Sequence, residues 1–450
     1  MGTVHAKEPE KPLNVRRSAN IKNLPVKVEK VVIDGLAKTK DDLVVQLIQP
    51  VFGAHNFEEL IFTSLEVKST LDRLGIFKRV QMTIDTSDES FGNDGYKILY
   101  EVEEKRTFSG SVNTLIGNNE GSLLFAFKFP NLFGRAERLS MEHTYGTNNT
   151  RGFGVELEKP VGGDPDTRLG GSVYQTQGEY PWSGYKETDR GVSLDLSFPT
   201  RLGAHGVKWA GEWRELKSLS RSTSFAVREQ AGHSLKSSLK HTFVRDRRDD
   251  AILPTTGTFI KTSQEFAGLG GTAEFVKGDI ELQANKSLFL DTVVQMSLAG
   301  GFMKSTDPQK EIKINDKFFL GGPLTLRGFN KHGVGPHSNG NALGADTFWL
   351  GALHLYTPLP FRPGKGGFGD LFKSHFFVNV GNCINYDYNR DVRDNARLLG
   401  ENVRLAYGLG VVLRLGGVAR LELNYVIPKW LQSCDSANPG LQFGIGLTFL

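Results

Sequence analysis

The chain has 450 residues, and 54 Lys and Arg against 50 Asp and Glu give a formal net charge of +4. This near balance argues against a nucleic-acid-binding protein with a broad basic face. No run of about 18 apolar residues is present, which excludes a helical membrane protein. The mean hydropathy of −0.29 leaves a membrane β-barrel open, because strands that alternate apolar and polar residues average to a soluble value.

The first 25 residues lack the apolar core of a secretory signal peptide. Glu8, Pro9, Glu10 and Pro12 disfavour an amphipathic, Arg-rich transit helix. We therefore expect residues 1–25 to form a disordered tail of a protein that is made in the cytosol.

Residues 26–105 predict a small α+β domain in the order strand, helix, helix, strand, strand. Thr39 is expected to cap the first helix with Asp42 as its capping-box acid, and Pro50 to end it. The second helix is expected to start at Asn56 and to end at Gly75. The strands are expected over residues 28–33, 80–84 and 96–102.

The segment LGIFKRVQMTID, residues 74–85, resembles the helix-to-strand corner of a POTRA domain. POTRA domains bind extended chains by adding a strand to their sheet edge. On these residues alone, another small α+β fold stays open.

From residue 106 onward, segments of about ten residues alternate apolar and polar side chains and are separated by turn residues. In residues 418–427, for example, Leu421, Leu423 and Tyr425 oppose Arg420, Glu422 and Asn424. The apolar face is a core in a soluble sandwich and meets lipid in a transmembrane barrel, so alternation alone does not decide between them.

Three features favour the barrel. We count about sixteen such segments, an even number that suits a closed barrel, and a strand is expected over the last residues, 441–450. Glycine is abundant on the expected inner face, which suits strongly bent strands. The predicted fold is an all-β transmembrane barrel of about sixteen antiparallel strands over residues 106–450, preceded by the α+β domain.

The connections between strands sort by length. Those on one side are mostly short, whereas the other side carries long ones at residues 216–233, 305–342, 387–400 and 428–440. The longest, between the expected strands eleven and twelve, contains the tetrapeptide Leu326, Arg327, Gly328 and Phe329.

With this motif, the chain resembles the outer-membrane barrel-assembly superfamily, in which POTRA domains precede a sixteen-stranded barrel with an Arg-Gly-Phe tip in loop six. Residues 131–137, NLFGRAE, are similar to the family's turn after strand two. Its structural turn after strand eight is matched by RDRRDDAILPTTGTF. The matching residues are Asp246, Arg248, Asp249, Pro254 and Gly257.

A single POTRA domain and no signal peptide resemble the mitochondrial members, the barrel subunits of the sorting and assembly machinery. The resemblance implies a multi-pass barrel in the mitochondrial outer membrane, with the POTRA domain in the intermembrane space. It implies porin-like β-barrel precursors as substrates, metaxin-like peripheral subunits, and inner-membrane contact-site proteins such as mitofilin as partners.

A barrel that inserts other barrels must open between its first and last strands. The first strand is expected over residues 107–117, where small polar residues make a poor lipid-facing stripe and suit a lateral gate. Its residues of interest are Thr107, Phe108, Gly110, Val112, Leu115 and Gly117. A precursor strand would add to this edge by backbone pairing.

The expected last strand fits the C-terminal signal of mitochondrial barrel precursors, polar-x-Gly-x-x-hydrophobic-x-hydrophobic. The fitting residues are Gln442, Gly444, Leu447 and Phe449. The chain's own last strand therefore resembles the signal that it would recognise.

In the family, the loop-six Arg pairs with an acid in an F-x-D-x-G strand. Here Asn379 stands in the place of that acid, and an amide cannot form the ion pair. Inner-face glutamates such as Glu422 or Glu156 are the alternative partners of Arg327.

Enzyme motifs are absent from the sequence. The segment at residues 362–370 is Gly-rich but lacks the hydroxyl that follows Lys in a phosphate-binding loop, and is expected to be a solvated turn. His332 and His337 lack supporting metal ligands, and two cysteines, Cys383 and Cys434, are too few for a zinc site. We expect a non-enzyme without cofactor or metal, which inserts barrel precursors; a protein-translocating or passive channel is the alternative.

Overall fold

The computed structural model describes residues 24–86, 95–117, 120–359, 368–387, 390–417, 419–447 and 449–450. The expected tail and most of the expected turn at residues 362–370 lie outside them. The chain divides into two compact units. The first comprises Met1–Thr107 with two hairpin turns, Pro130–Glu137 and Pro160–Pro165, and the second comprises the rest.

The first unit is an α+β domain with the predicted element order. A three-stranded sheet has the order β1-β3-β2, with β1 parallel and β2 antiparallel to β3. Its elements are β1 Lys27–Asp34, α1 Asp41–Ile48, the 3-10 helix η2 Gln49–Gly53, α2 Phe57–Leu74, β2 Phe77–Thr86 and β3 Gly95–Glu104.

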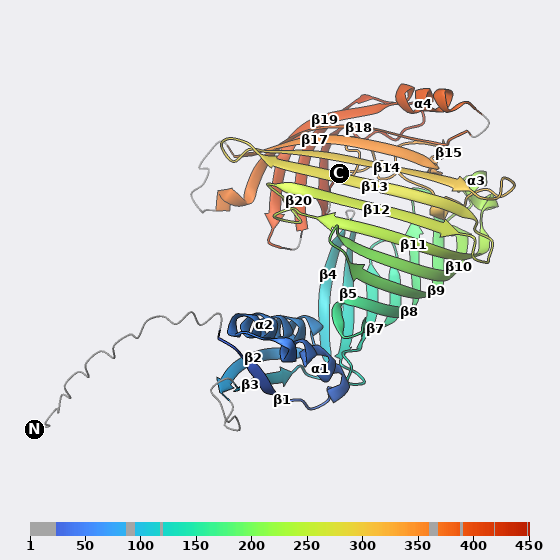
Figure 1. Cartoon of the computed structure of the whole chain (residues 1–450). Helices are drawn as coiled ribbons and strands as arrows, with labels where there is room; N and C mark the ends of the chain where they lie inside the picture. The colour runs from blue at the N-terminus through green and yellow to red at the C-terminus, as the bar shows by residue number, and fades with distance from the viewer. Residues whose placement is uncertain are drawn as a thin grey trace, which may run out of the picture. The chain divides into compact units, whose positions relative to one another are not determined.

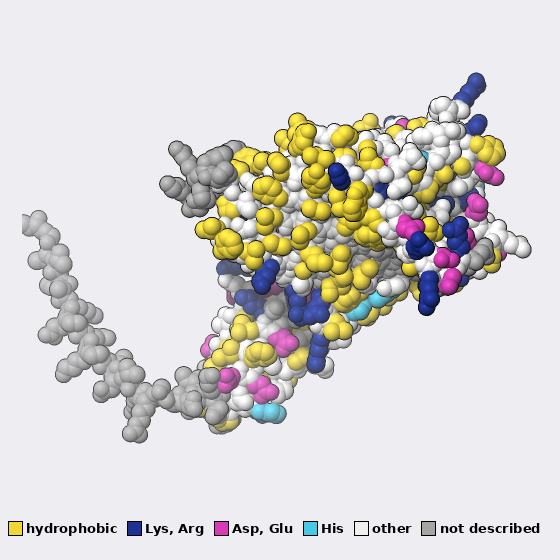
Figure 2. All heavy atoms as spheres, turned by 90° about the horizontal axis from the view of Figure 1, so that it is seen from above, with side chains coloured by type: hydrophobic (Ala, Val, Ile, Leu, Met, Phe, Trp, Pro, Cys, Tyr) yellow, Lys and Arg dark blue, Asp and Glu magenta, His cyan; other side chains and the backbone are white. Residues whose placement is uncertain are grey.

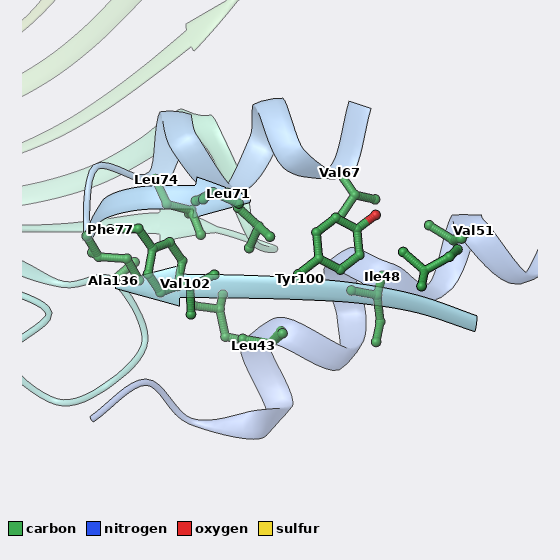
Figure 3. Close-up of a cluster of buried hydrophobic side chains, with 14 of the residues drawn as sticks. Leu43, Ile48, Val51, Val67, Leu71, Leu74, Phe77, Tyr100, Val102 and Ala136 are labelled. Carbon is green, nitrogen blue, oxygen red and sulfur yellow. The ribbon is translucent and has the colours of Figure 1, made fainter. Parts of the chain in front are cut away.

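Apolar side chains from both helices cover one face of this sheet. Figure 3 shows Val67, Leu71 and Leu74 of α2 and Leu43 of α1 near Tyr100 and Val102 of β3. The Tyr100 hydroxyl donates to the Ser64 carbonyl over 3.1 Å, so the only polar atom of that buried ring is satisfied.

The two helix starts differ from each other. Asn56 caps α2 as predicted, because its side chain accepts from the Glu59 amide, and Gly75 ends the helix at φ +74°. Lys40, not Thr39, occupies the cap position of α1, so the predicted Thr39 cap is wrong. The Thr39 hydroxyl instead donates to the Glu104 carboxylate over 2.6 Å.

The second unit is a sheet of 16 strands in sequence order from β4 to β21. Figure 1 shows these strands curling into a barrel, and the end strands β4 and β21 contact each other. The first eight are β4 Ser109–Gly117, β5 Glu120–Pro130, β6 Arg138–Gly146, β7 Arg151–Val161, β8 Asp164–Tyr180, β9 Tyr185–Pro199, β10 Ala204–Ser218 and β11 Gly232–Asp246. The other eight are β12 Gly257–Ala267, β13 Phe275–Ser287, β14 Val293–Ser305, β17 Thr347–Pro358, β18 Phe372–Ile384, β19 Arg404–Leu415, β20 Ala419–Trp430 and β21 Gly440–Gly446.

Short elements lie in the connections. They are α3 Phe225–Glu229, η3 Ile314–Asp316, β15 His337–Ser338, β16 Asn341–Ala342, η4 Phe368–Leu371 and α4 Val392–Glu401. No helix in the described part of the chain is long and apolar enough to cross a membrane. We call residues 306–346, between β14 and β17, loop six; they hold η3, β15 and β16.

The apolar face of the strands is on the outside. On β20, Leu423, Tyr425 and Ile427 are 47%, 51% and 41% exposed, whereas Glu422 and Asn424, which alternate with them, are 0% and 2% exposed. Figure 2 shows hydrophobic side chains spread over the outer face of the barrel. An apolar outside with a polar inside is the pattern of a transmembrane barrel, not of a soluble sandwich.

The last strand is shorter than predicted. β21 ends at Gly446, so the expected strand over residues 441–450 does not continue. Leu447 follows the strand and is exposed, but Phe449 is only 5% exposed and lies against the Arg420 guanidinium, 4.2 Å from the ring centre. Stacking on this buried cation outweighs the alternation that predicted an outward Phe449.

Glu104 makes the α+β domain sensitive to acid. Burial alone would raise the pKa of its carboxyl, but hydrogen bonds from Thr39, Ala37 and Lys38 hold it below the ordinary 4.5. Because the folded-state pKa is depressed, this contribution is full above the unfolded pKa and is lost as the pH falls through the folded one.

We expect hydrogen-exchange protection of the Thr39 amide, corrected for intrinsic rates, to fall as the pH drops below about 4.5. In Glu104→Gln, that acid-dependent loss should disappear. Protection that falls equally in both proteins would contradict this account.

Candidate functional site

The tip of loop six is buried against β20 and β21. Leu326, Arg327 and Phe329 have no exposed surface, and Leu326 and Phe329 join a cluster with Ala406 and Val426. Gly328 between them has φ +88°, and a Cβ there would lie 3.2 Å from the side chains of Ala406 and Val426. The tip therefore requires glycine for its turn and for its close packing.

Arg327 is anchored by Glu422 of β20. Its Nη2 and Nε donate to the same carboxylate oxygen, Oε2, over 2.9 and 3.1 Å, and neither side chain is exposed. Its Nη1 donates to the Leu450 main-chain oxygen over 2.7 Å, and the ring of Phe377 lies 5.1 Å away. A buried charge is tolerated only when it is paired and hydrogen-bonded, so this pair fixes the position of the loop tip.

Glu422 also faces a second arginine. Arg420 Nη2 lies 2.5 Å from its other oxygen, Oε1, in an ion pair without hydrogen-bond geometry. Asn424 donates to Oε2 over 2.8 Å, and its amide oxygen is hydrogen-bonded to His375 Nδ1. One carboxylate thus holds two buried guanidinium groups.

A second attachment holds the start of loop six. Arg214 of β10 binds Asp316 with two hydrogen bonds of 2.8 and 2.9 Å, and both side chains are nearly fully buried. Lys277 of β13 donates to the Asp316 carbonyl over 2.6 Å. The two hydrogen bonds from Arg214 to the Asp316 carboxylate form the planar contact to which a guanidinium group is suited.

Loop six also reaches the other end of the sheet. Lys331 forms an ion pair with Glu120, the first residue of β5, and its ammonium lies 4.1 Å from the centre of the Trp182 ring. Loop six therefore contacts the first hairpin of the barrel as well as its last strand.

The last strand turns its polar face toward loop six. The Gln442 amide oxygen accepts from the Gly328 N–H over 2.9 Å, and its nitrogen donates to the Phe329 carbonyl over 3.2 Å. Gly444 and Gly446 follow on the same face, next to Pro323 and Leu324. Beyond the strand, the Leu450 amide donates to the Leu324 carbonyl over 2.9 Å.

The described part of the first strand, residues 109–114, has no comparable contact with loop six. All side chains of residues 109–114 are exposed, on both faces of β4, including Val112 at 65%. Thr107 and Phe108 precede the strand, Gly110 lies within it, and Leu115 and Gly117 belong to the part of β4 whose side chains are not described. Over the described residues, the two ends of the sheet are therefore unequal: β21 is braced from inside, and β4 pairs with β5.

Comparison with known proteins assigns the family. Residues 131–449 match the Omp85 superfamily domain. The sorting and assembly machinery component 50 homologue of Bos taurus is 49% identical over 433 residues, which cover 96% of this chain and 92% of that protein. The homologue of Homo sapiens is 47% identical over the same shares.

The chain belongs to the SAM50 family of the Omp85 superfamily. SAM50 homologues are non-enzymatic assembly factors that sit in the mitochondrial outer membrane as β-barrels, and the family implies β-barrel assembly. A more distant SAM50-like protein of Drosophila melanogaster is 32% identical over 96% of each chain.

The fold is also that of a bacterial protein of known structure. The structure of BamA from Haemophilus ducreyi lacking POTRA domains 1–3 matches with a TM-score of 0.75, over 94% of this chain and 84% of that one. At 19% identity this likeness shows the fold alone. It supports the sixteen-stranded barrel preceded by a POTRA-like domain.

In this SAM50-family barrel, the two glutamates that were expected as alternative partners of Arg327 differ in their contacts. Glu422 makes the ion pair, whereas Glu156 lies half-buried on β7 and forms no ion pair with Arg327 in the described part of the chain. Asn379 is buried beside the loop, where its amide donates to the Thr325 carbonyl over 3.1 Å. Asn379 thus contacts loop six but does not take the place of the acidic partner of Arg327.

The expected turn after strand eight lies between β11 and β12. Arg248 binds both carboxylate oxygens of Asp246, and Asp249 accepts from the amides of Thr255 and Thr256. Pro254 is buried, and Gly257 has φ +101° with its α-hydrogen facing the Arg247 carbonyl, where a Cβ would lie 2.2 Å away. These residues build a turn and lie far along the sheet from the loop tip.

Several residues of the site had no signal in the sequence analysis. The path of loop six through the barrel brings Asp316 to Arg214 and, at a separate place, Lys331 to Glu120.

Cys383 and Cys434 are both free. No group of three or more His, Cys, Asp or Glu within the described residues is able to hold a metal ion.

We expect Glu422→Gln to destabilise the barrel by about 3–5 kcal/mol, because it leaves Arg327 and Arg420 buried without a counter-charge. Denaturant unfolding of the refolded protein in detergent measures this. Glu156→Gln is the matched control and should change stability by less than about 1 kcal/mol. Equal effects of the two substitutions would contradict the central place of Glu422.

Proposed function

We propose that this protein inserts β-barrel precursors into the mitochondrial outer membrane through a lateral gate between β4 and β21. The C-terminal strand of a precursor pairs with the edge of β4 and takes the place that β21 holds at rest. The new barrel then grows at the seam and leaves when its own first and last strands close.

The observation that carries this proposal is the inequality of the two end strands. β21 is braced by loop six, whereas β4 exposes both faces over residues 109–114. β21 is also the shortest of the 16 strands, at 7 residues, and pairs with only part of the 12-residue β20. A short β21 offers few backbone groups for pairing with β4, so we expect the sheet to open most readily at the seam between these two strands.

Strand exchange explains why no energy-rich cofactor is needed. An unpaired backbone amide in hydrocarbon costs several kcal/mol, so a bare strand edge is not stable in the membrane. A precursor strand that replaces β21 supplies the same amides and carbonyls to β4. The number of hydrogen bonds stays nearly constant during the exchange, and closure of the product barrel in lipid drives release.

The chain's own last segment supports the identity of the signal. Gln442 and Gly444 stand at the polar and glycine positions of a polar-x-Gly-x-x-hydrophobic-x-hydrophobic pattern, with Leu447 and Phe449 at its hydrophobic positions. A precursor with this pattern therefore competes with β21 for one site.

The α+β domain lies in the intermembrane space in this proposal. An even number of strands puts both ends of the barrel sequence on the side of the short turns, and the α+β domain directly precedes the first strand in the sequence. Its sheet leaves β1 and β2 as edge strands, which suit β-augmentation by an arriving precursor or by a contact-site protein such as mitofilin. Metaxin-like subunits would bind on the cytosolic side, where the long connections lie.

A protein-translocating or passive channel on the same barrel is the competing function. Loop six argues against an open pore, because its tip and its start are both anchored to inner-face side chains by buried ion pairs. The two functions make different predictions. An insertase is required for the assembly of barrel proteins, whereas a channel is required for the passage of other proteins.

Depletion of the protein followed by import into isolated mitochondria separates them. We expect a labelled porin precursor to cross the outer membrane and then stall before its assembled form on native gels, while a matrix-targeted precursor imports normally. Normal porin assembly in depleted mitochondria would contradict the proposal and favour a pore.

A further inference from the structure

A groove lies on the outer wall of the barrel, over strands β7 to β11. It has a volume of about 460 Å³, within the range of sites that hold small ligands. Gly211 of β10 contributes no side chain, and a Cβ there would lie 3.5 Å from the Trp209 ring and 3.9 Å from the Val192 side chain. The sheet is therefore uncovered at Gly211, which forms the floor. The apolar lining includes Phe153, Val173, Val192, Gly211, Trp213 and Leu235.

A positive charge lies among these apolar side chains. Arg190 of β9 lines the groove, and its Nε donates to the Gln175 side-chain oxygen over 3.0 Å. Its guanidinium carbon lies 5.1 Å from the centre of the Trp213 ring. Among the described residues, neither Nη1 nor Nη2 of Arg190 has a hydrogen-bond partner, and no carboxylate forms an ion pair with it. The guanidinium is thus held in place with its two terminal nitrogens open to a ligand.

The position of Arg190 marks the edge of the apolar band. On β9, the outward side chains are apolar at Leu194 and Val192, 57% and 45% exposed, and become polar at Arg190. In the register of the sheet, Arg190 lies opposite Gln175 and Trp213. A change from apolar to polar side chains, with a tryptophan at the change, is typical of the membrane–water interface. Arg190 therefore lies at the depth of the lipid headgroups, and the apolar part of the groove lies at the depth of the acyl chains.

We propose that this groove is a binding site for one anionic glycerophospholipid, with its phosphate on the Arg190 guanidinium and an acyl chain over Gly211. The lipid belongs to the leaflet on the side of the long connection between β10 and β11, because Trp213 lies near the end of β10 at Ser218. The site is built by strands other than β4 and β21, so it does not depend on the lateral gate.

The charge of the site selects an anionic headgroup. A guanidinium binds a phosphate through two parallel hydrogen bonds, for which Nη1 and Nη2 of Arg190 are available. Glu215, the next outward residue after Trp213 on β10, is already paired with Lys217 over 2.8 Å. The charge of Arg190 is therefore not compensated within the described groove. A headgroup with a net negative charge compensates it, whereas a zwitterionic headgroup brings its own ammonium to the site.

The shape of the site selects a lipid over a free anion. An acyl chain in the hollow contacts its walls as well as its floor, so it buries more apolar surface than a chain against a flat wall. A phosphate ion or a soluble headgroup gains only the contact with Arg190, whose side chain is exposed. One charge contact joined to an apolar groove is the pattern that a phospholipid fits.

The test uses the full-length protein refolded into phosphatidylcholine vesicles. An increasing share of the lipid is replaced by phosphatidylglycerol or phosphatidylcholine with brominated acyl chains, and quenching of tryptophan fluorescence is measured. Trp213 lines the groove and Trp209 lies beside its floor, so both report an acyl chain there. We expect half-maximal quenching at an about fivefold lower share of the brominated anionic lipid than of the zwitterionic one, from one compensated arginine.

Two substitutions remove the two halves of the site and keep every tryptophan. Arg190→Gln removes the charge, and Gly211→Leu fills the hollow at a position where a Cβ meets only ordinary contact distances. We expect each to abolish the preference for the anionic lipid. Arg151→Gln is the matched control, because Arg151 is also exposed and lies 5.6 Å from an aromatic ring, that of Tyr145. It should keep the full preference, and heat-dependent migration on gels verifies that each variant is folded.

Three results would overturn the inference. The first is equal quenching by the two brominated lipids in the unsubstituted protein. The second is a preference that survives Arg190→Gln and Gly211→Leu, or that Arg151→Gln reduces as strongly, since either result assigns it to general attraction between the barrel and anionic lipid. The third is release of the brominated lipid by glycerol 3-phosphate in the buffer, which would show a site for a free anion.

Discussion

The buried ion pair between Arg327 and Glu422 is the interaction on which the rest of the site depends. Neither side chain is exposed, so the pair cannot open without leaving a charge in a low-dielectric interior. It keeps the loop tip against β20, and from that position the tip braces β21 and contacts Phe449 and Leu450. Among the described residues, the loop tip thus supports the β21 edge of the seam from inside.

In the proposed function, the support of β21 by the loop tip gives the barrel a defined place of opening. The packing of β21 against loop six is specific, whereas residues 109–114 of β4 bury no side chain on either face. Under the proposed function, a strand that arrives at residues 109–114 meets no buried side chain, whereas a strand that replaces β21 also lies against loop six. Main-chain pairing at β4 would then provide affinity that does not depend on sequence.

Sequence patterns predicted the architecture more accurately than they predicted the contacts between side chains. Alternation on β20 placed Leu423 and Tyr425 outside and Glu422 inside, because period two is a local property of a strand. The same rule failed at Phe449, where a buried arginine 4.2 Å away competes with lipid for the ring. Thr39 matched a capping box, but the distant Glu104 accepts its hydroxyl. Alternation places many acids inside the barrel, and only the path of loop six selects Glu422 over Glu156 as the partner of Arg327.

Locking the seam tests the central claim most directly. Pairs of cysteines across β4 and β21, introduced after Cys383 and Cys434 are replaced by Ser, are oxidised in isolated mitochondria before a labelled porin precursor is added. The account predicts that assembly of porin stops while the lock is closed, and returns when the disulfide is reduced. Porin that assembles at its normal rate with the seam covalently closed would show that precursors do not pass between β4 and β21.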